Sequence, residues 1–332
     1  MKAAPLSKKK EKSLCLLIVG LGVIGSVHAS ILEGQERAPV AVCDIVRERL
    51  EKYPSAEKYT EYLRMLEEVR PDTVHICTPH YLHADMIIEA LKRDINVLCE
   101  KPLCIREEDF SRISDAERSS RGQLGVCHQN RYNEANIFVR DYLRGKEISG
   151  AYGTVVWNRD AEYYASGDWR GKRETEGGGV LINQALHTLD LLEWLVGEPH
   201  FVTSNIFNLT LPSVIETEDT AAAVFSGGAE FCFFATNGGA VDFPVQMTIR
   251  ADGETITVLP ETVIIDGKRR DFTKDTHRYG KCCYGTGHEK LIADFYDCLE
   301  TGRKFPIDGT ESAKVVKLIL ACYRSEGKKV EI

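Results

Sequence analysis

The feature that most constrains the fold is a glycine-rich turn between an apolar run and a helical stretch near the N-terminus. The apolar run Leu14–Val19 leads into Gly20-Leu21-Gly22-Val23-Ile24-Gly25, where a helix is predicted to begin. Glycines in this pattern permit a tight turn, let the backbone approach a pyrophosphate and allow close packing of helix on strand. The helix N-terminus would present free N–H groups to the anion. This spacing predicts a βαβ unit that binds a dinucleotide.

An acidic residue stands where such a unit would need one. Asp44 ends the second apolar run, Val40–Cys43, and follows Gly25 by 19 residues. A carboxylate there would accept hydrogen bonds from the adenosine ribose and repel a 2′-phosphate. We therefore expect NAD as the cofactor. Arg47 lies close enough in sequence to keep NADP as the less favoured alternative.

The first third of the chain alternates apolar runs with helical stretches. Three further runs, each nearly continuous in apolar residues, are Thr73–Cys77, Ile95–Cys99 and Leu124–Cys127. Continuous apolar runs are typical of strands buried on both faces of a parallel sheet. Alternating strands and helices imply right-handed crossovers and a doubly wound α/β fold. We expect a Rossmann domain over residues 1–128.

The pattern changes after Asn130. Short strands separated by turn pairs such as Gly238-Gly239 and Asp252-Gly253 indicate an antiparallel meander. The expected strands are Gly153–Asn158, Phe201–Leu209, Thr220–Phe225, Glu230–Ala235, Val245–Arg250, Thr255–Leu259 and Val263–Ile265. The expected helices are Glu134–Leu143, Val180–Val196, His288–Leu299 and Glu311–Ser325. Residues 129–332 are therefore predicted to form a second, α+β domain with a large open sheet.

Composition narrows the class of protein. The 332 residues carry 42 Lys and Arg against 50 Asp and Glu, a net charge of −8, which argues against a nucleic-acid binder. Eleven cysteines occur without a CxxC pair, so we interpret them as reduced thiols of a cytoplasmic protein. Lys8-Lys9-Lys10 before Leu14–Val19 imitates a secretion signal, but this apolar run is too short to span a bilayer. We expect a cytoplasmic protein that does not bind membranes.

A second candidate site follows the fifth apolar run. Glu100-Lys101-Pro102 stands at a carboxyl strand end, where ligands bind in open α/β sheets. A lysine beside bound nicotinamide and a substrate hydroxyl would lose solvation and acquire a lowered pKa, which suits it to proton transfer. An ordinary surface turn is the alternative.

Three polar residues interrupt the apolar helix that follows Gly177-Gly178-Gly179. Asn183, His187 and Asp190 are spaced to share one helix face. Metal ligation is the alternative interpretation, but Asn is a poor ligand for transition metals. We therefore expect a catalytic or substrate-binding face and no metal.

Together these motifs resemble the Gfo/Idh/MocA oxidoreductases, the family of glucose-fructose oxidoreductase and inositol dehydrogenase. The resemblance rests on the glycine-rich turn, Cys77-Thr78-Pro79 with His83, Glu100-Lys101-Pro102, and the triple glycine with its Asn/His/Asp helix. It covers the chain from Leu14 to the last helix. It implies reversible NAD(P)-dependent oxidation of a secondary alcohol on a sugar, sugar derivative or cyclitol. It also implies a homodimer or homotetramer assembled through the C-terminal sheet.

The resemblance also assigns roles to individual residues. Lys101 and His187 match the catalytic pair that handles the hydroxyl proton. The implied cofactor contacts are Gly20, Gly22, Val23, Ile24, Gly25, Asp44, Thr78, Pro79, His83, Glu100, Lys101, Trp169 and Arg170. The implied substrate contacts are Lys101, Asn183, His187 and His288, the last within Gly285-x-Gly287-His288.

One departure from the family pattern affects the substrate. Inositol-dehydrogenase-like members carry Asp where this chain has Asn183, which binds a hydroxyl but cannot act as acid or base. Inositol is therefore less favoured than a free or nucleotide-linked sugar. Two alternatives share the fold: an NAD-dependent glycoside hydrolase, and a catalytically silent sugar or NAD sensor.

Overall fold

The first sheet is a six-stranded parallel sheet in a computed structural model that describes residues 14–272 and 286–332. Its strand order is β3-β2-β1-β4-β5-β6, and every pairing is parallel. The strands are β1 (Leu16–Val19), β2 (Ala41–Cys43), β3 (Glu57–Tyr59), β4 (Thr73–Ile76), β5 (Asn96–Cys99) and β6 (Leu124–Val126). The strand order reverses between β1 and β4, which confirms the predicted Rossmann arrangement.

Helices connect these strands and cover the sheet. They are α1 (Val23–Gly34), α2 (Arg47–Leu50), α3 (Tyr62–Val69), α4 (His83–Leu91) and α5 (Glu108–Ser119). The apolar side chains of β1, β2 and β4 are fully buried, so the predicted continuous apolar runs are core strands. Strand β3 was missed because its residues Glu57 and Lys58 are exposed and form no apolar run.

The second sheet has nine strands within the described residues. Its order is β14-β13-β12-β11-β7-β10-β9-β8-β15. The strands are β7 (Ile148–Val156), β8 (Phe201–Phe207), β9 (Thr220–Ser226), β10 (Phe231–Thr236), β11 (Gln246–Ala251), β12 (Glu254–Leu259), β13 (Thr262–Ile265), β14 (Lys268–Asp271) and β15 (Val330–Glu331). The expected open, mainly antiparallel sheet is confirmed, with one parallel pairing, that of β10 with β7. The sheet is mixed and mainly antiparallel.

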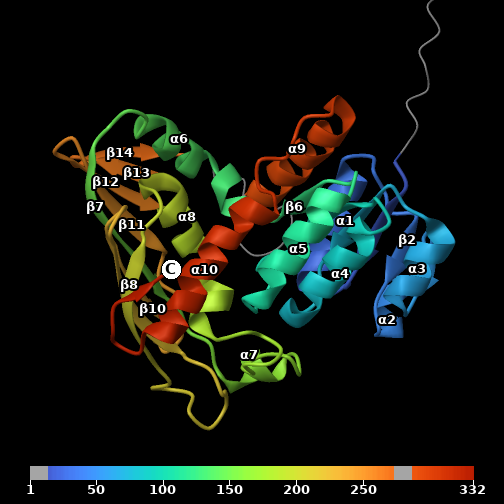
Figure 1. The fold of residues 1–332 in the computed structure, drawn as a ribbon, viewed down its shortest axis with the longest axis horizontal. Helices are drawn as coiled ribbons and strands as arrows, with labels where there is room; N and C mark the ends of the chain where they lie inside the picture. Colours follow the sequence, from blue (N-terminus) through green and yellow to red (C-terminus); the bar gives the residue numbers. More distant parts are fainter. Residues whose placement is uncertain (1–13, 273–285) are drawn as a thin grey trace, which may run out of the picture.

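The remaining helices lie on or between the sheets. They are η2 (Gln129–Tyr132), α6 (Glu134–Tyr142), α7 (Ala161–Ala165), η3 (Leu181–Ala185), α8 (Leu186–Val196), α9 (Gly287–Thr301) and α10 (Gly309–Ser325). Helices α6, α8 and α10 contact the second sheet, and α10 also contacts α5, so it lies between the two sheets (Figure 1). Helix α9 packs on α1 and η2 instead.

The helix predicted over Val180–Val196 has two parts. Its first turn, η3, is a π-helix, and α8 continues from Leu186 as an α-helix. Such wide turns are often found at functional sites. The widened turn carries Asn183, and the first α-helical turn carries His187.

Two further expectations concern thiols and membranes. All nine cysteines of the described ranges are free, and seven of them are buried, as expected for core thiols. Cys282 and Cys283 lie outside the described residues. Over residues 14–272 and 286–332, no helix combines the length and apolar character needed to cross a membrane.

Candidate active site

The glycine-rich turn leaves room for a nucleotide only on its outer side. Gly20 has φ +84°, and a Cβ there would lie 2.5 Å from the carbonyl oxygen of Cys77. A Cβ at Gly25 would lie 1.8 Å from the oxygen of Gly20, so the start of α1 packs directly on the turn. A Cβ at Gly22 would meet no atom within 4 Å. The turn is closed where strand and helix meet and open where a pyrophosphate would bind.

Asp44 is fixed beside this turn. Its carboxylate accepts hydrogen bonds from the backbone N–H groups of Leu21, at 2.6 Å, and Val46, at 2.8 Å. The guanidinium of Arg49 lies 3.3 Å from the carboxylate, whereas Arg47 is exposed. The basic neighbour of Asp44 is therefore Arg49. The open turn and the held carboxylate together fit the pyrophosphate and ribose of NAD.

His83 ties the turn after β4 to the segment that carries Lys101. Its ring nitrogens lie 2.7 Å from the carbonyl oxygen of Pro102 and 2.9 Å from that of Thr78. Burial lowers the pKa of His83. His83 was predicted to contact the cofactor. In the structure it joins two loops at the carboxyl edge of the first sheet, next to Pro79.

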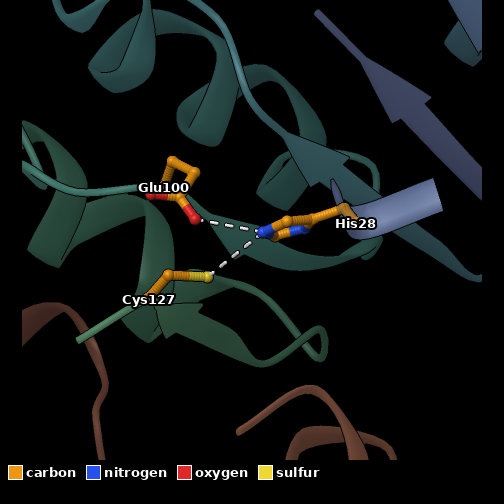
Figure 2. A group of neighbouring side chains, drawn as sticks. All are labelled: His28, Glu100 and Cys127. Atoms are coloured by element: carbon orange, nitrogen blue, oxygen red, sulfur yellow. Dashed lines mark hydrogen bonds and ion pairs between the residues drawn. The ribbon is translucent and has the colours of Figure 1, made fainter. Parts of the chain in front are cut away.

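Glu100 lies in a buried network with histidines. Its Oε1 is 3.0 Å from Nε2 of His28 and 3.3 Å from Nε2 of His288. Figure 2 shows His28 pointing from α1 toward Glu100 and Cys127, which both face the same ring nitrogen. Burial alone would raise the pKa of Glu100, but the hydrogen bonds from His28 and His288 hold it well below its usual range. The carboxylate is thus kept ionised and fixed one residue before Lys101.

The network extends away from the predicted site. Nδ1 of His28 lies 2.8 Å from Nδ1 of His75, whose Nε2 lies 2.9 Å from the hydroxyl of Tyr296. His28, Glu100 and Cys127 have the residue types of a metal site, with donor atoms within 4.8 Å of one another. The 3.0 Å separation of Nε2 and Oε1 is that of a hydrogen bond, which accounts for both atoms without an ion.

Lys101 joins the two domains at the predicted catalytic position. Its Nζ donates to the backbone oxygen of Asn183 at 3.0 Å and to Oδ1 of the same residue at 3.2 Å. Lys101 follows β5 of the first sheet, while Asn183 lies in η3 of the second domain. The two motifs, 82 residues apart in sequence, are therefore in contact.

His187 is buried close to Lys101. Burial and the neighbouring ammonium of Lys101 hold its pKa well below its usual value of 6.5. The ring is therefore neutral at pH 7 and can accept a proton. Its buried Nδ1 has no hydrogen-bond partner within the part of the chain that the structure describes.

Asp190 forms its hydrogen bonds and ion pairs with residues other than His187. Its carboxylate accepts two hydrogen bonds from Arg131, at 2.7 and 2.9 Å, and lies 3.0 Å from Nδ1 of His128. Burial opposes ionisation, but Arg131 and His128 hold the pKa of Asp190 below its usual range. This buried ion pair anchors α8 to η2, so Asp190 has a structural role.

The predicted pair Trp169 and Arg170 lies on the same side as Asn183. Arg170 donates to the hydroxyl of Tyr163 at 2.6 Å, and Asn183 donates to that hydroxyl at 3.3 Å. The Trp169 ring packs on His80 of the first domain, with centroids 4.8 Å apart. These contacts bring residues 163–170 to the junction between the two domains.

His288 lies beside another predicted site residue, Glu100, and its contact with substrate stays a prediction. It was predicted to contact substrate, and the structure places it against Glu100, with 3 % of its surface exposed. Gly285 of the same motif lies outside the described residues.

Sequence reasoning missed three contributors to the site: His28, Tyr163 and Glu176. His28 lies three residues after Gly25, one helical turn along α1, so its spacing was a readable signal. Tyr163 lies in a short helix that no pattern predicted. Glu176 directly precedes the triple glycine and has no spacing that marks it as a site residue.

Comparison with known proteins agrees with this geometry. Residues 14–128 match the oxidoreductase family with an NAD-binding Rossmann fold, and residues 147–256 match the GFO/IDH/MocA C-terminal domain. Inositol 2-dehydrogenase of Salmonella typhimurium is 29% identical over 193 residues, covering 55% of this chain and 54% of the relative. The chain therefore spans about half the length of that relative.

Two other relatives align over nearly their whole length. D-glucoside 3-dehydrogenase of Escherichia coli is 28% identical, covering 90% of this chain and 99% of the relative. The WlbA dehydrogenase of Bordetella pertussis, solved with NADH and UDP-GlcNAcA, superposes with a TM-score of 0.84 at 27% identity, covering 97% and 99% of the two chains. The two family matches together span more than half of the chain, so this protein belongs to the Gfo/Idh/MocA family of NAD-binding oxidoreductases.

Proposed function

We propose that this protein is an NAD-dependent dehydrogenase that oxidises a secondary hydroxyl of a sugar or sugar derivative. The observation that carries the proposal is the meeting of Lys101 with the η3–α8 segment at the carboxyl edge of the Rossmann sheet. An ammonium, an amide and a neutral imidazole there suit a ligand rich in hydroxyl groups. Bound NAD supplies the hydride acceptor for the carbinol carbon.

The two candidate catalytic side chains have complementary roles. His187 is neutral and accepts the hydroxyl proton, while Lys101 donates a hydrogen bond to the same oxygen and stabilises the developing alkoxide. Trp169 and Arg170 border the site from the second domain, close to Tyr163 and Asn183.

The relatives favour a pyranose ring as substrate. The glucoside dehydrogenase and the WlbA enzyme align with this chain over nearly their whole length, whereas the inositol enzyme aligns over about half. Asn183 is an amide that can bind a hydroxyl, as Asn183 Nδ2 already does with Tyr163. We therefore place free, alkyl-linked and nucleotide-linked sugars ahead of inositol.

A substrate panel tests the proposal. Purified protein is incubated with NAD and with glucose, methyl glucosides, a UDP-linked sugar or myo-inositol, and NADH is followed by absorbance. We expect NADH to form in proportion to protein with at least one sugar. Release of aglycone from a glycoside without net NADH would replace the proposal by the hydrolase alternative. Tight sugar or NAD binding with neither product would replace it by the sensor alternative.

A further inference from the structure

Glu176 is a buried carboxylate next to the proposed catalytic lysine. Only 1 % of its surface is exposed. One carboxylate oxygen accepts a hydrogen bond from the backbone N–H of Gly171, and the other accepts one from Nδ2 of Asn183 at 2.5 Å. Because Oδ1 of Asn183 accepts from Lys101, the carboxylate, the amide and the ammonium form a continuous chain of hydrogen bonds.

This chain permits one orientation of the amide. In that orientation, Nδ2 donates to Glu176 and to the hydroxyl of Tyr163, and Oδ1 accepts from Lys101. Rotation of the amide by 180° would set Oδ1 against the carboxylate and the NH₂ group against the ammonium. Both contacts would be repulsive, since an ionised carboxylate only accepts hydrogen bonds and an ammonium only donates them. Glu176 thus selects the rotamer in which Asn183 can hold Lys101.

The pKa of Glu176 is raised overall, because burial outweighs the groups that favour its ionised form. Burial raises its pKa, while the N–H of Gly171, the amide of Asn183 and the cations Arg170 and Lys101 act in the opposite direction. The phenols that face it are Tyr163 and Tyr164, whose own pKa values are raised by burial.

We propose that Glu176 is a positioning residue, which fixes the Asn183 amide and through it holds the Lys101 ammonium where the reacting hydroxyl binds. The catalytic part of this inference rests on the proposed dehydrogenase function. If Glu176 positions Asn183, the two residues form a matched pair, with one negative charge at position 176 and none at position 183. An aspartate at 183 would set two carboxylates at hydrogen-bond distance and force them to share a proton.

Exchanging the two groups tests the pair. In E176Q the amide loses its fixed partner, so kcat should fall about tenfold, since a hydrogen bond to a charged group is typically worth about that factor. N183D should lower kcat by about the same factor, and the pH at which its kcat changes should differ from that of the wild type. In E176Q/N183D the charge is restored beside Lys101, and the new amide at position 176 donates to the new carboxylate at position 183. That variant should recover to within about threefold of wild type.

Rescue separates positioning from a structural role. If Glu176 only supported the fold, the double variant would be impaired by the product of the two single losses, and that result would overturn the proposal. E174Q, which removes an exposed carboxylate two residues away, is the matched control and should leave kcat unchanged. Melting curves establish that each variant is folded.

A second readout is independent of turnover. The Asn183 side-chain amide protons, identified by the NMR signal that N183D loses, should resonate at low field in the wild type because one donates to a carboxylate. In E176Q that signal should move upfield, and in E174Q it should stay in place. An unchanged signal in E176Q would overturn the positioning role even in an active enzyme. A wild type that forms no NADH would refute the dehydrogenase function, while the amide signal would still decide whether Glu176 fixes Asn183.

Discussion

Individual side chains were predictable where a backbone motif fixes their position. Asp44 directly follows one apolar run and Lys101 follows another after a single residue. Parallel strands bring their carboxyl ends to one edge, so the sequence alone located both residues there. The side chains that contact these two residues were harder to predict from the sequence. Arg49 instead of Arg47 faces Asp44, and His288 faces Glu100, because both contacts depend on how helices pack. Glu176 was passed over because a lone glutamate before glycines has no distinguishing spacing.

The first prediction concerns the choice between NAD and NADP, which depends on the Asp44 carboxylate. Held by the N–H groups of Leu21 and Val46, it would face the ribose of NAD and repel the 2′-phosphate of NADP. We expect kcat/KM with NAD to exceed that with NADP by at least about tenfold, since one unfavourable contact of ~1.4 kcal/mol gives that factor. Asp44→Ser should narrow the difference. Steady-state kinetics in which NADP equals NAD would contradict this and direct attention to Arg47 and Arg49.

At the scale of elements, strands with continuous apolar runs were predicted and the exceptions have physical causes. Strands β3 and β14 are short and largely exposed, so no hydrophobic pattern indicates them. The parallel pairing of β7 with β10 joins segments that are distant in sequence, which turn residues cannot reveal. The π-helical turn was hidden because its residues are buried on every side.

The second prediction concerns Gly179, at the start of the η3–α8 segment. A Cβ at Gly179 would lie 1.9 Å from the backbone oxygen of Glu218, whose carboxylate accepts from the N–H groups of Gly179 and Leu181. Gly179→Ala must displace the turn that carries Asn183. We expect a loss of about 1–3 kcal/mol of stability, the usual cost of overpacking, and a fall in kcat. Calorimetry and NAD titration check this, because NAD affinity should be retained. Wild-type kcat in this variant would show that the turn need not be fixed.

At the scale of the whole molecule, buried histidines predict how stability depends on pH. The pKa is lowered, primarily by burial, for His28, His75, His80, His83 and His187. The folded chain therefore binds fewer protons than the unfolded chain below about pH 6.5, so the free energy of unfolding falls as the pH falls. Four carboxyls act in the opposite direction above about pH 4.5, because burial raises the pKa of Glu193 and Glu218 to about 7 and also raises the pKa of Glu117 and Glu176.

The five histidines outnumber these four carboxyls, so we expect Tm to be lower at pH 5.5 than at pH 7.5. Differential scanning calorimetry at the two values measures the difference. His75→Gln should reduce it, because one titrating group is removed. An equal or higher Tm at pH 5.5 would contradict the predicted protonation states.

The fourth prediction concerns assembly of the protein through the exposed face of the second sheet. Strand register sets Cys232 between Val224 and Tyr152, and Phe234 beside Ala222, on the face opposite the buried Phe233. Val224, Phe234 and Tyr152 are 52%, 40% and 42% exposed. An apolar patch on an open sheet suits a second copy of the chain. We predict a dimer or tetramer.

Light scattering at micromolar concentration measures the assembly directly. A mass of 37.2 kDa, that of one chain, would contradict the prediction. Val224→Lys should dissociate the assembly by burying a charge in the interface. Leu63→Lys, at an exposed apolar residue of α3, is the matched control and should leave the mass unchanged.

A double-mutant cycle on Lys101 and His187 tests most directly whether the two domains act on one substrate hydroxyl. Lys101→Ala and His187→Ala should each lower kcat roughly 10²–10⁴-fold, the range for general acid–base groups. His187→Ala should leave NAD affinity nearly unchanged, because His187 lies on the second domain. If both side chains contact one oxygen, the double variant should lose far less than the product of the two single losses. A folded His187→Ala variant with near wild-type kcat, or fully multiplicative losses, would contradict a shared catalytic site.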